Sequence, residues 1–140
     1  PMIYRLSNTL DAMVGYENDE LRDIGYVPAK MDDILNYIPA RISGLYVVLS
    51  AYLLKLDGKN AFSVMMRDAR NSPSPNSGYT MASTAGALNI QLVKKDTYIL
   101  GDDKKDIVAD DISKAVSLSR LAIMLFTLTV ILLLILIVIL

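Results

Sequence analysis

Three short segments of this chain together carry residue types that suit phosphate and the Mg²⁺ that accompanies it: carboxylates for the metal, and side-chain amides, arginines and clustered hydroxyls for the phosphate. The 140 residues include no histidine and no cysteine. That composition excludes Ser-His-Asp hydrolases, thiolate catalysis, disulfides and zinc sites built on His or Cys. Any acid–base or metal chemistry must therefore use Asp, Glu, Lys, Tyr or the substrate itself.

The first segment is NTLDAMVGY, residues 8–16. On a helix, Asn8 and Asp11 are three residues apart and share a face, so they could present an amide and a carboxylate to one ligand. The ordinary alternative is a capped helix start, with Asn8 or Thr9 as the N-cap and Asp11 in the first turn.

The second segment is MDDILNYIPAR, residues 31–41. On a helix, Asn36 follows Asp32 by four residues and Asp33 by three, which places two carboxylates and an amide on adjacent parts of one face. Such hard oxygen ligands suit Mg²⁺ that carries substrate phosphates. Arg41 could clamp a phosphate or carboxylate through two parallel hydrogen bonds. The alternative is a solvated helix face followed by an arginine at a membrane edge.

The third segment is RDARNSPSPNSGY, residues 67–79. Ser74, Asn76 and Gly78 belong to a dense turn that opens a helix of small residues. The free N–H groups of a helix N-terminus suit phosphate, Gly78 allows close approach to the backbone, and Arg67 could add positive charge. The alternative is a proline-rich loop with a helix cap. The loop is not a Walker A sequence, because the GxxxxGK[ST] pattern is absent.

Hydrophobic spacing predicts that helices position these segments. We expect helices over residues 1–23, 29–38, 60–70 and 79–88, with a restart at Val27-Pro28 and a bend or end at Pro39. Within residues 79–88, Ala82 and Gly86 have the small-xxx-small spacing that lets helices approach closely. Residues 91–101 are expected to be extended, and residues 101–111 to form a charged linker before a helix that begins near Ile112.

The run LAIMLFTLTVILLLILIVIL, residues 121–140, contains no charge over twenty residues. Twenty helical residues match a hydrocarbon core of roughly 30 Å, so we predict a transmembrane helix rather than the buried core helix of a soluble domain. A second apolar stretch, residues 42–54, is short for a span. It spans only if its helix continues back through Pro39 to Ile34; otherwise it is a core, interfacial or re-entrant helix.

The prediction is thus a mainly α, integral membrane protein in three parts. Residues 1–101 carry the motifs and the short apolar stretch, residues 102–119 form a charged linker and helix, and residues 120–140 form the membrane helix. Basic residues precede the last helix and none follows it, which places the polar body in the cytoplasm by the positive-inside rule. With 14 Lys and Arg against 15 Asp and Glu, no general basic surface suggests nucleic acid.

The segments YRLSNTLDAMVGY (4–16), DDILNYIPAR (32–41) and SPNSGYTMASTAGAL (74–88) resemble, in this order, the CobD/CbiB family of membrane-bound cobalamin-biosynthesis proteins. The resemblance covers roughly residues 4–101, and Tyr98 and Gly101 match a Tyr-x-x-Gly-like stretch of that family. It implies an adenosylcobinamide-phosphate synthase, a ligase of the cell (inner) membrane that consumes ATP. Such a ligase joins aminopropanol, usually as its O-phosphate, to adenosylcobyric acid through an amide. It also implies a multi-pass protein of about twice this length, of which this chain would be the C-terminal half.

For that reaction we assign Asp11, Asp32 and Asp33 as catalytic carboxylates, the latter two as Mg²⁺ ligands for ATP. The residues assigned to substrate or phosphate binding are Asn8, Tyr16, Asn36, Arg41, Arg67, Ser74, Asn76 and Gly78. The expected partners are the corrinoid, aminopropanol phosphate, the lipid bilayer and other cobalamin-pathway enzymes.

One position departs from the family pattern, because Ser72 stands where members often have a histidine. Either that histidine is not catalytic, or this protein is altered in activity. Two other functions remain open. One is a non-catalytic membrane scaffold that recruits cobalamin-pathway enzymes, which would bind neither Mg-ATP nor cobyric acid. The other is a fragment of a transporter.

Overall fold

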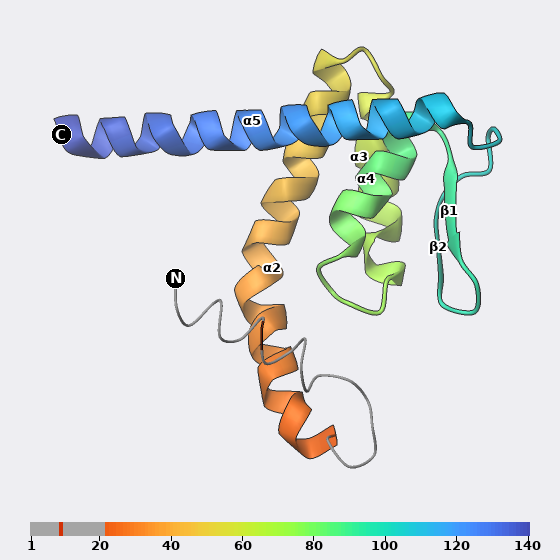
Figure 1. Ribbon diagram of the computed structural model, residues 1–140, viewed down its shortest axis with the longest axis horizontal. Coiled ribbons are helices and arrows are strands. Elements are labelled where there is room, and N and C mark those ends of the chain that lie inside the picture. Colours follow the sequence, from red (N-terminus) through yellow and green to blue (C-terminus); the bar gives the residue numbers. More distant parts are fainter. Residues whose placement is uncertain (1–8, 10–21) are drawn as a thin grey trace. The chain divides into compact units, whose positions relative to one another are not determined.

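The computed structural model describes Thr9 and residues 22–140, and it is mainly helical, as predicted (Figure 1). The chain divides into two compact units, residues 1–39 and 40–140. The elements in chain order are α2 (Arg22–Leu53), α3 (Gly58–Asp68), a 3-10 turn η1 (Ala69–Asn71), α4 (Gly78–Leu88), β1 (Gln91–Lys94), β2 (Tyr98–Gly101) and α5 (Ala109–Ile139). The expected helix over residues 1–23 lies almost entirely outside the described residues.

Helix α2 continues through Gly25, Pro28 and Pro39. The prediction of a restart at Pro28, and of Pro39 as a helix end, is therefore wrong. Each proline removes only one i→i−4 hydrogen bond, and the neighbouring turns keep theirs. Past Pro39 the helix is also held by packing, since Val47 and Ala51 are buried in the core of residues 40–140.

Helices α3 and α4 form the centre of the second unit, and both were predicted within two residues at their starts. They pack closely because Gly86 has no side chain. A Cβ there would lie 2.7 Å from the backbone oxygen of Asn60 and 2.8 Å from Cα of Ala61. The small-xxx-small prediction for Ala82 and Gly86 is confirmed, because both residues are buried on this face.

Strands β1 and β2 pair antiparallel as a hairpin, with Leu92 opposite Leu100 and Val93 opposite Ile99. The expectation of extended chain over residues 91–101 is confirmed for the two strands, whereas residues 95–97 form the turn between them. Gly101 adopts φ +83°, and a Cβ at this position would lie 2.3 Å from the carbonyl oxygen of Ile90. Both constraints favour glycine where the hairpin leaves the core.

Helix α5 begins at Ala109, three residues before the expected start. Its first half packs on the core through Leu118 and Ala122, whereas residues 131–140 are exposed apolar side chains. Figure 1 shows α5 passing across the residue 40–53 part of α2 rather than alongside it. The crossing is fixed by Tyr46, whose hydroxyl donates to Oγ1 of Thr129 at 2.8 Å and whose ring meets Phe126 edge-on at 5.7 Å.

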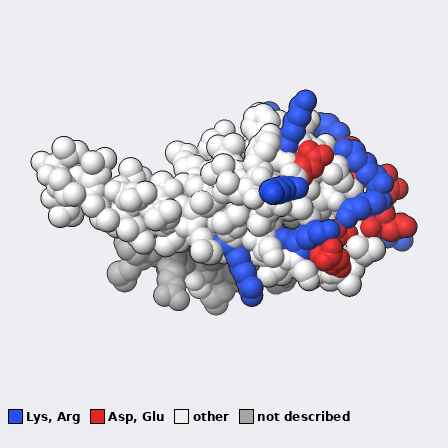
Figure 2. Space-filling model, turned by 90° about the horizontal axis from the view of Figure 1, so that it is seen from above, with Lys and Arg blue, Asp and Glu red and all other residues white. Residues whose placement is uncertain are grey.

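Two helical segments are long and apolar enough to cross a membrane, Lys30–Leu53 and Ala109–Ile139. The helix of residues 42–53 continues back through Pro39 and past Ile34. The length that the sequence-based prediction required for a membrane span is therefore present. Charged side chains are gathered over one end of the molecule in Figure 2, and the arm that projects from the other end shows none. This separation is the pattern expected of a chain with a lipid-facing part.

Candidate functional site

The predicted site residues fall into three groups in the structure. Asn8, Asp11 and Tyr16 lie outside the described residues, so their assignments stay predictions. Asp32, Asp33 and Asn36 belong to the first unit. The remaining assigned residues, Arg41, Arg67, Ser74, Asn76 and Gly78, belong to the second unit.

In the first unit, Asp32 and Asn36 share a helix face, as their spacing predicts, and they bond to each other. Nδ2 of Asn36 donates to Oδ2 of Asp32 at 2.9 Å and to the Asp32 carbonyl oxygen at 3.1 Å. The Asn36 amide thus turns its nitrogen, not its oxygen, toward this carboxylate. Among the described residues no group of three acidic, His or Cys side chains could hold a metal ion. Asp32 and Asp33 fit a Mg²⁺ only if the phosphates it carries supply the other ligands, which is how such ions are often bound.

In the second unit, the structure brings Arg41, the last residue of the second motif, against Tyr79 of the third. The guanidinium of Arg41 lies over the ring of Tyr79, 4.4 Å from its centroid. Gly44, one helical turn after Arg41, allows this approach, because a Cβ there would lie 3.2 Å from Cβ of Tyr79 and 2.8 Å from Sδ of Met65. Tyr79 is itself buried and directly follows the Ser74–Gly78 turn. Arg41 is therefore stacked at the start of α4, although 38 residues separate the two partners in sequence.

The turn before α4 is held by its own hydroxyls. The Oγ atoms of Ser72 and Ser77 are 2.7 Å apart, and Oγ of Ser74 accepts from the N–H of Asn76 at 3.3 Å. Packing requires Gly78, since a Cβ there would lie 1.9 Å from the carbonyl oxygen of Ala69. Ser72 is thus buried, and its hydroxyl belongs to the hydrogen bonding of this turn.

Arg67 is already engaged by two carboxylates. Its Nε and Nη2 donate to the two oxygens of Asp68 at 2.7 and 2.8 Å, and Nη2 also donates to Oδ1 of Asp102 at 2.8 Å. These bonds raise the pKa of Arg67, and the Arg67 bond together with the Gly101 N–H lowers the pKa of Asp68 against the effect of burial. A phosphate would compete with this arrangement, which joins α3 to the end of the hairpin.

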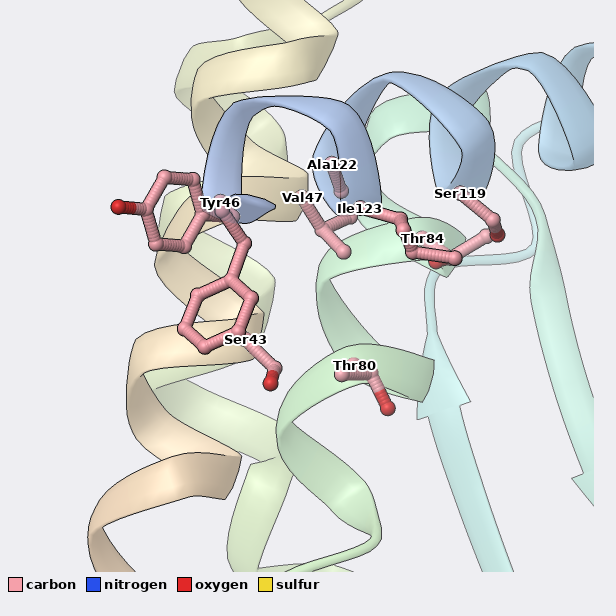
Figure 3. A pocket seen from close by; sticks show the side chains of 9 residues that line it. Ser43, Tyr46, Val47, Thr80, Thr84, Ser119, Ala122 and Ile123 are labelled. Atoms are coloured by element: carbon pink, nitrogen blue, oxygen red, sulfur yellow. The ribbon is translucent and has the colours of Figure 1, made fainter. Parts of the chain in front are cut away.

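Sequence reasoning missed a pocket of about 230 Å³ between the residue 40–53 part of α2, helix α4 and helix α5 (Figure 3). Its lining combines hydroxyl and apolar side chains: Ser43, Tyr46, Val47, Thr80, Thr84, Ser119, Ala122, Ile123 and Phe126. The signal in the sequence was the presence of single hydroxyl residues inside otherwise apolar helices. Nothing in the spacing shows that these three segments converge.

Comparison with known proteins places the motifs in a family. The model of the family described as "CobD/Cbib protein" matches residues 1–124. The "Probable cobalamin biosynthesis protein CobD" of Methanothermobacter thermautotrophicus is 53% identical over 126 residues, which is 90% of this chain and 42% of the relative.

Two further relatives are similar over most of the chain. The "Cobalamin biosynthesis protein CobD" of Streptococcus sanguinis is 44% identical, and the match covers 84% of this chain and 40% of that relative. The "Cobalamin biosynthesis protein CbiB" of Salmonella arizonae is 43% identical, and the match covers 89% of this chain and 43% of that relative. The chain therefore spans less than half the length of these curated relatives. No solved structure matches it.

Proposed function

The chain belongs to the CobD/CbiB protein family, and from this membership we propose that it acts in cobalamin biosynthesis. The proposed reaction is ATP-dependent amide formation between adenosylcobyric acid and aminopropanol or its O-phosphate. The names of the relatives support the pathway, and the reaction type rests on the resemblance of the three motifs.

The single structural observation that carries the proposal is the stacking of Arg41 on Tyr79 at the turn before α4. It brings the cation of Arg41 against Tyr79, the residue that directly follows the hydroxyl-bearing turn before α4. Such donors are suited to the negative charge of a phosphate or carboxylate. We assign this place to the phosphate of a substrate.

In the proposed chemistry, the substrate carboxylate takes the terminal phosphoryl group of ATP, which forms an acyl phosphate and releases ADP. The amine then attacks the acyl carbon, loses a proton and expels phosphate, so the net products are the amide, ADP and phosphate. Arg41 stabilises developing charge on phosphate, because a fixed cation is most effective where charge forms. Asp32 and Asp33 would hold Mg²⁺, which neutralises phosphate charge when it is bound.

The proposal includes the membrane. Because α5 passes across residues 40–53 of α2, these two segments cannot both lie along the membrane normal. We assign residues 121–140 to the span and residues 42–53 to the interface. This assignment keeps the residues on both flanks of 42–53 on one side of the bilayer, with the polar body cytoplasmic.

The test is amide formation from adenosylcobyric acid, aminopropanol O-phosphate and Mg-ATP by the purified chain, measured by product and by ADP release. Arg41→Gln should lower kcat/KM at least tenfold, whereas the control Arg70→Gln, an exposed residue of η1, should leave it within twofold. Equal activity of both variants and the parent would remove Arg41 from the site. If the chain binds neither Mg-ATP nor cobyric acid at equilibrium, the scaffold function replaces the enzyme.

A further inference from the structure

The pocket between α2, α4 and α5 lies where α5 enters its uncharged run (Figure 3). Ser119 lines the pocket just before that run, and Ala122, Ile123 and Phe126 line it from within the run. Because residues 121–140 are assigned to the membrane span, the hydrocarbon of the bilayer begins at the level of this pocket. The acyl chains of the surrounding phospholipids are thus within reach of it.

The walls of the pocket act mainly as an apolar surface. Three of its five wall hydroxyls are already donated to the protein. The Tyr46 hydroxyl donates to Oγ1 of Thr129 at 2.8 Å, and the hydroxyls of Ser119 and Thr80 donate to carbonyl oxygens about one turn earlier, at 2.9 and 3.5 Å. The lining contains no carboxylate, lysine or arginine. A charged group would lose its hydration here without gaining an opposite charge, so the pocket favours an uncharged apolar ligand.

The size of the pocket fits a segment of lipid chain. Its volume of about 230 Å³ holds roughly eight methylene groups, if each takes about 30 Å³, the share of one water molecule in the liquid. A helix with its side chains is about 10 Å across and needs far more room, so a helix of a second copy does not fit. Left empty, the apolar walls would forfeit dispersion contacts, which an acyl chain restores.

A cation follows the lining residue Ser119 directly in α5. Arg120 is exposed, and it is the last charged residue before the uncharged run. It takes part in none of the ion pairs among the described residues. An arginine at this level suits the phosphate of a phospholipid, which it can bind through two parallel hydrogen bonds.

We propose that this pocket holds one acyl chain of a membrane phospholipid whose phosphate is bound by Arg120. The proposal rests on the membrane arrangement of the proposed function and is independent of amide formation. It has a distinctive consequence for α4, which lies outside the assigned span. Since α4 has no large exposed apolar side chain, lipid chains contact it only through the pocket.

The experiment is photo-crosslinking of the full chain in phosphatidylcholine vesicles that contain a small fraction of phosphatidylglycerol with a diazirine in the middle of one acyl chain. Trypsin cleaves after Arg70, Lys94 and Arg120, so α4 is recovered in the peptide 71–94 and the span in the peptide 121–140. Tandem mass spectrometry then separates label on α4 from label on the exposed hairpin residue Val93. The parent should carry label on both α4 and residues 121–140.

Matched variants locate the lipid chain. Thr84→Phe fills the pocket from α4, and Ser43→Phe fills it from an exposed position of α2. Each should lower the label on α4 at least about fivefold, because a filled pocket leaves no room for a chain, and should leave the label on residues 121–140 within about twofold. Thr127→Phe makes the same change on α5 outside the lining and should alter neither label. Far-UV circular dichroism of each variant should match the parent.

Arg120 is tested through the same α4 label. Arg120→Gln should lower this label about threefold to fivefold, whereas Arg120→Lys, which keeps the charge, should retain most of it. Equal labelling of the parent and Arg120→Gln would remove the phosphate contact from the proposal.

The two peptides distinguish failure of the pocket from failure of the membrane arrangement. Label on residues 121–140 without label on α4 would overturn the pocket proposal alone, and so would α4 label that persists in both Thr84→Phe and Ser43→Phe. Absence of label from residues 121–140 would overturn the membrane arrangement and the pocket proposal together. Loss of amide formation with the α4 label intact would count against the proposed reaction alone.

Discussion

At the scale of single residues, the ring of Tyr79 is the partner that positions Arg41. A guanidinium over an aromatic ring contributes about 0.5–2 kcal/mol, depending on its exposure to water. Tyr79→Leu and Arg41→Gln should therefore be non-additive in thermal unfolding by a coupling of that size, whereas Tyr79→Phe should preserve the coupling. Strictly additive changes would mean that the stacking contributes nothing.

Asp68 gives a pH-dependent prediction. Its pKa is lowered in the folded protein, so its contribution to stability is complete above the ordinary carboxyl pKa and disappears as the pH falls through the lowered value. Asp68→Asn should lower the free energy of unfolding by about 1–3 kcal/mol at pH 7, because charged hydrogen bonds to Arg67 and Gly101 are weakened.

The difference between Asp68→Asn and the parent should shrink steadily below about pH 4, the usual range of a carboxyl group. Denaturant unfolding from pH 7 to 3 measures it. Asp103→Asn, at an exposed position of the linker, is the control and should change stability by less than about 0.5 kcal/mol. A constant difference across that pH range would show that the charge of Asp68 is not what stabilises the fold.

At the scale of elements, the contact between α3 and α4 depends on the absence of a side chain at Gly86. Gly86→Ala places a methyl group against the backbone of Asn60 and Ala61, and rigid backbone cannot yield as a side chain can. We expect a loss of about 1–3 kcal/mol in denaturant unfolding, against no measurable loss for Ser63→Ala on the exposed face of α3. Unchanged stability of Gly86→Ala would mean that the two helices can separate without cost.

The elements also show how far sequence reasoning reaches. Helices α3 and α4 and the extended stretch were predictable because their patterns are local: Asp57 caps α3, and small residues mark α4. Helix α2 was predicted as separate segments, because a proline locally indicates a helix end. In the structure, the packing of Val47 and Ala51 outweighs the one hydrogen bond that Pro39 removes.

The site was predictable only in part for the same reason. The motifs around Arg41 and Gly78 could be identified from residue types, but their meeting at Tyr79 depends on contacts between distant segments. Tertiary packing also produces the ion pair between Arg67 and Asp102 and the pocket beside Tyr46. Hydrophobic periodicity reports only local structure and cannot predict either feature.

At the scale of the whole molecule, single-cysteine labelling tests the membrane arrangement, and the absence of natural cysteine makes each introduced one unique. Lys30→Cys and Lys59→Cys flank the apolar part of α2, and both should react with an impermeant maleimide from the cytoplasmic side. Leu140→Cys should react from the opposite side. Labelling of Lys30→Cys and Lys59→Cys from opposite sides would show instead that α2 spans the membrane.

The hydrogen bond between Tyr46 and Thr129 can form only late in synthesis of the chain. The two residues are 83 positions apart, so a ribosome adding about 5–20 residues per second makes Thr129 roughly 4 to 17 s after Tyr46. In that interval α3, α4 and the hairpin can fold through local contacts. The Tyr46 hydroxyl cannot yet bond to Thr129, because that residue has not been synthesised. The pocket is therefore completed late in biosynthesis, and a nascent chain stalled before α5 would hold a folded core with one wall of the pocket missing.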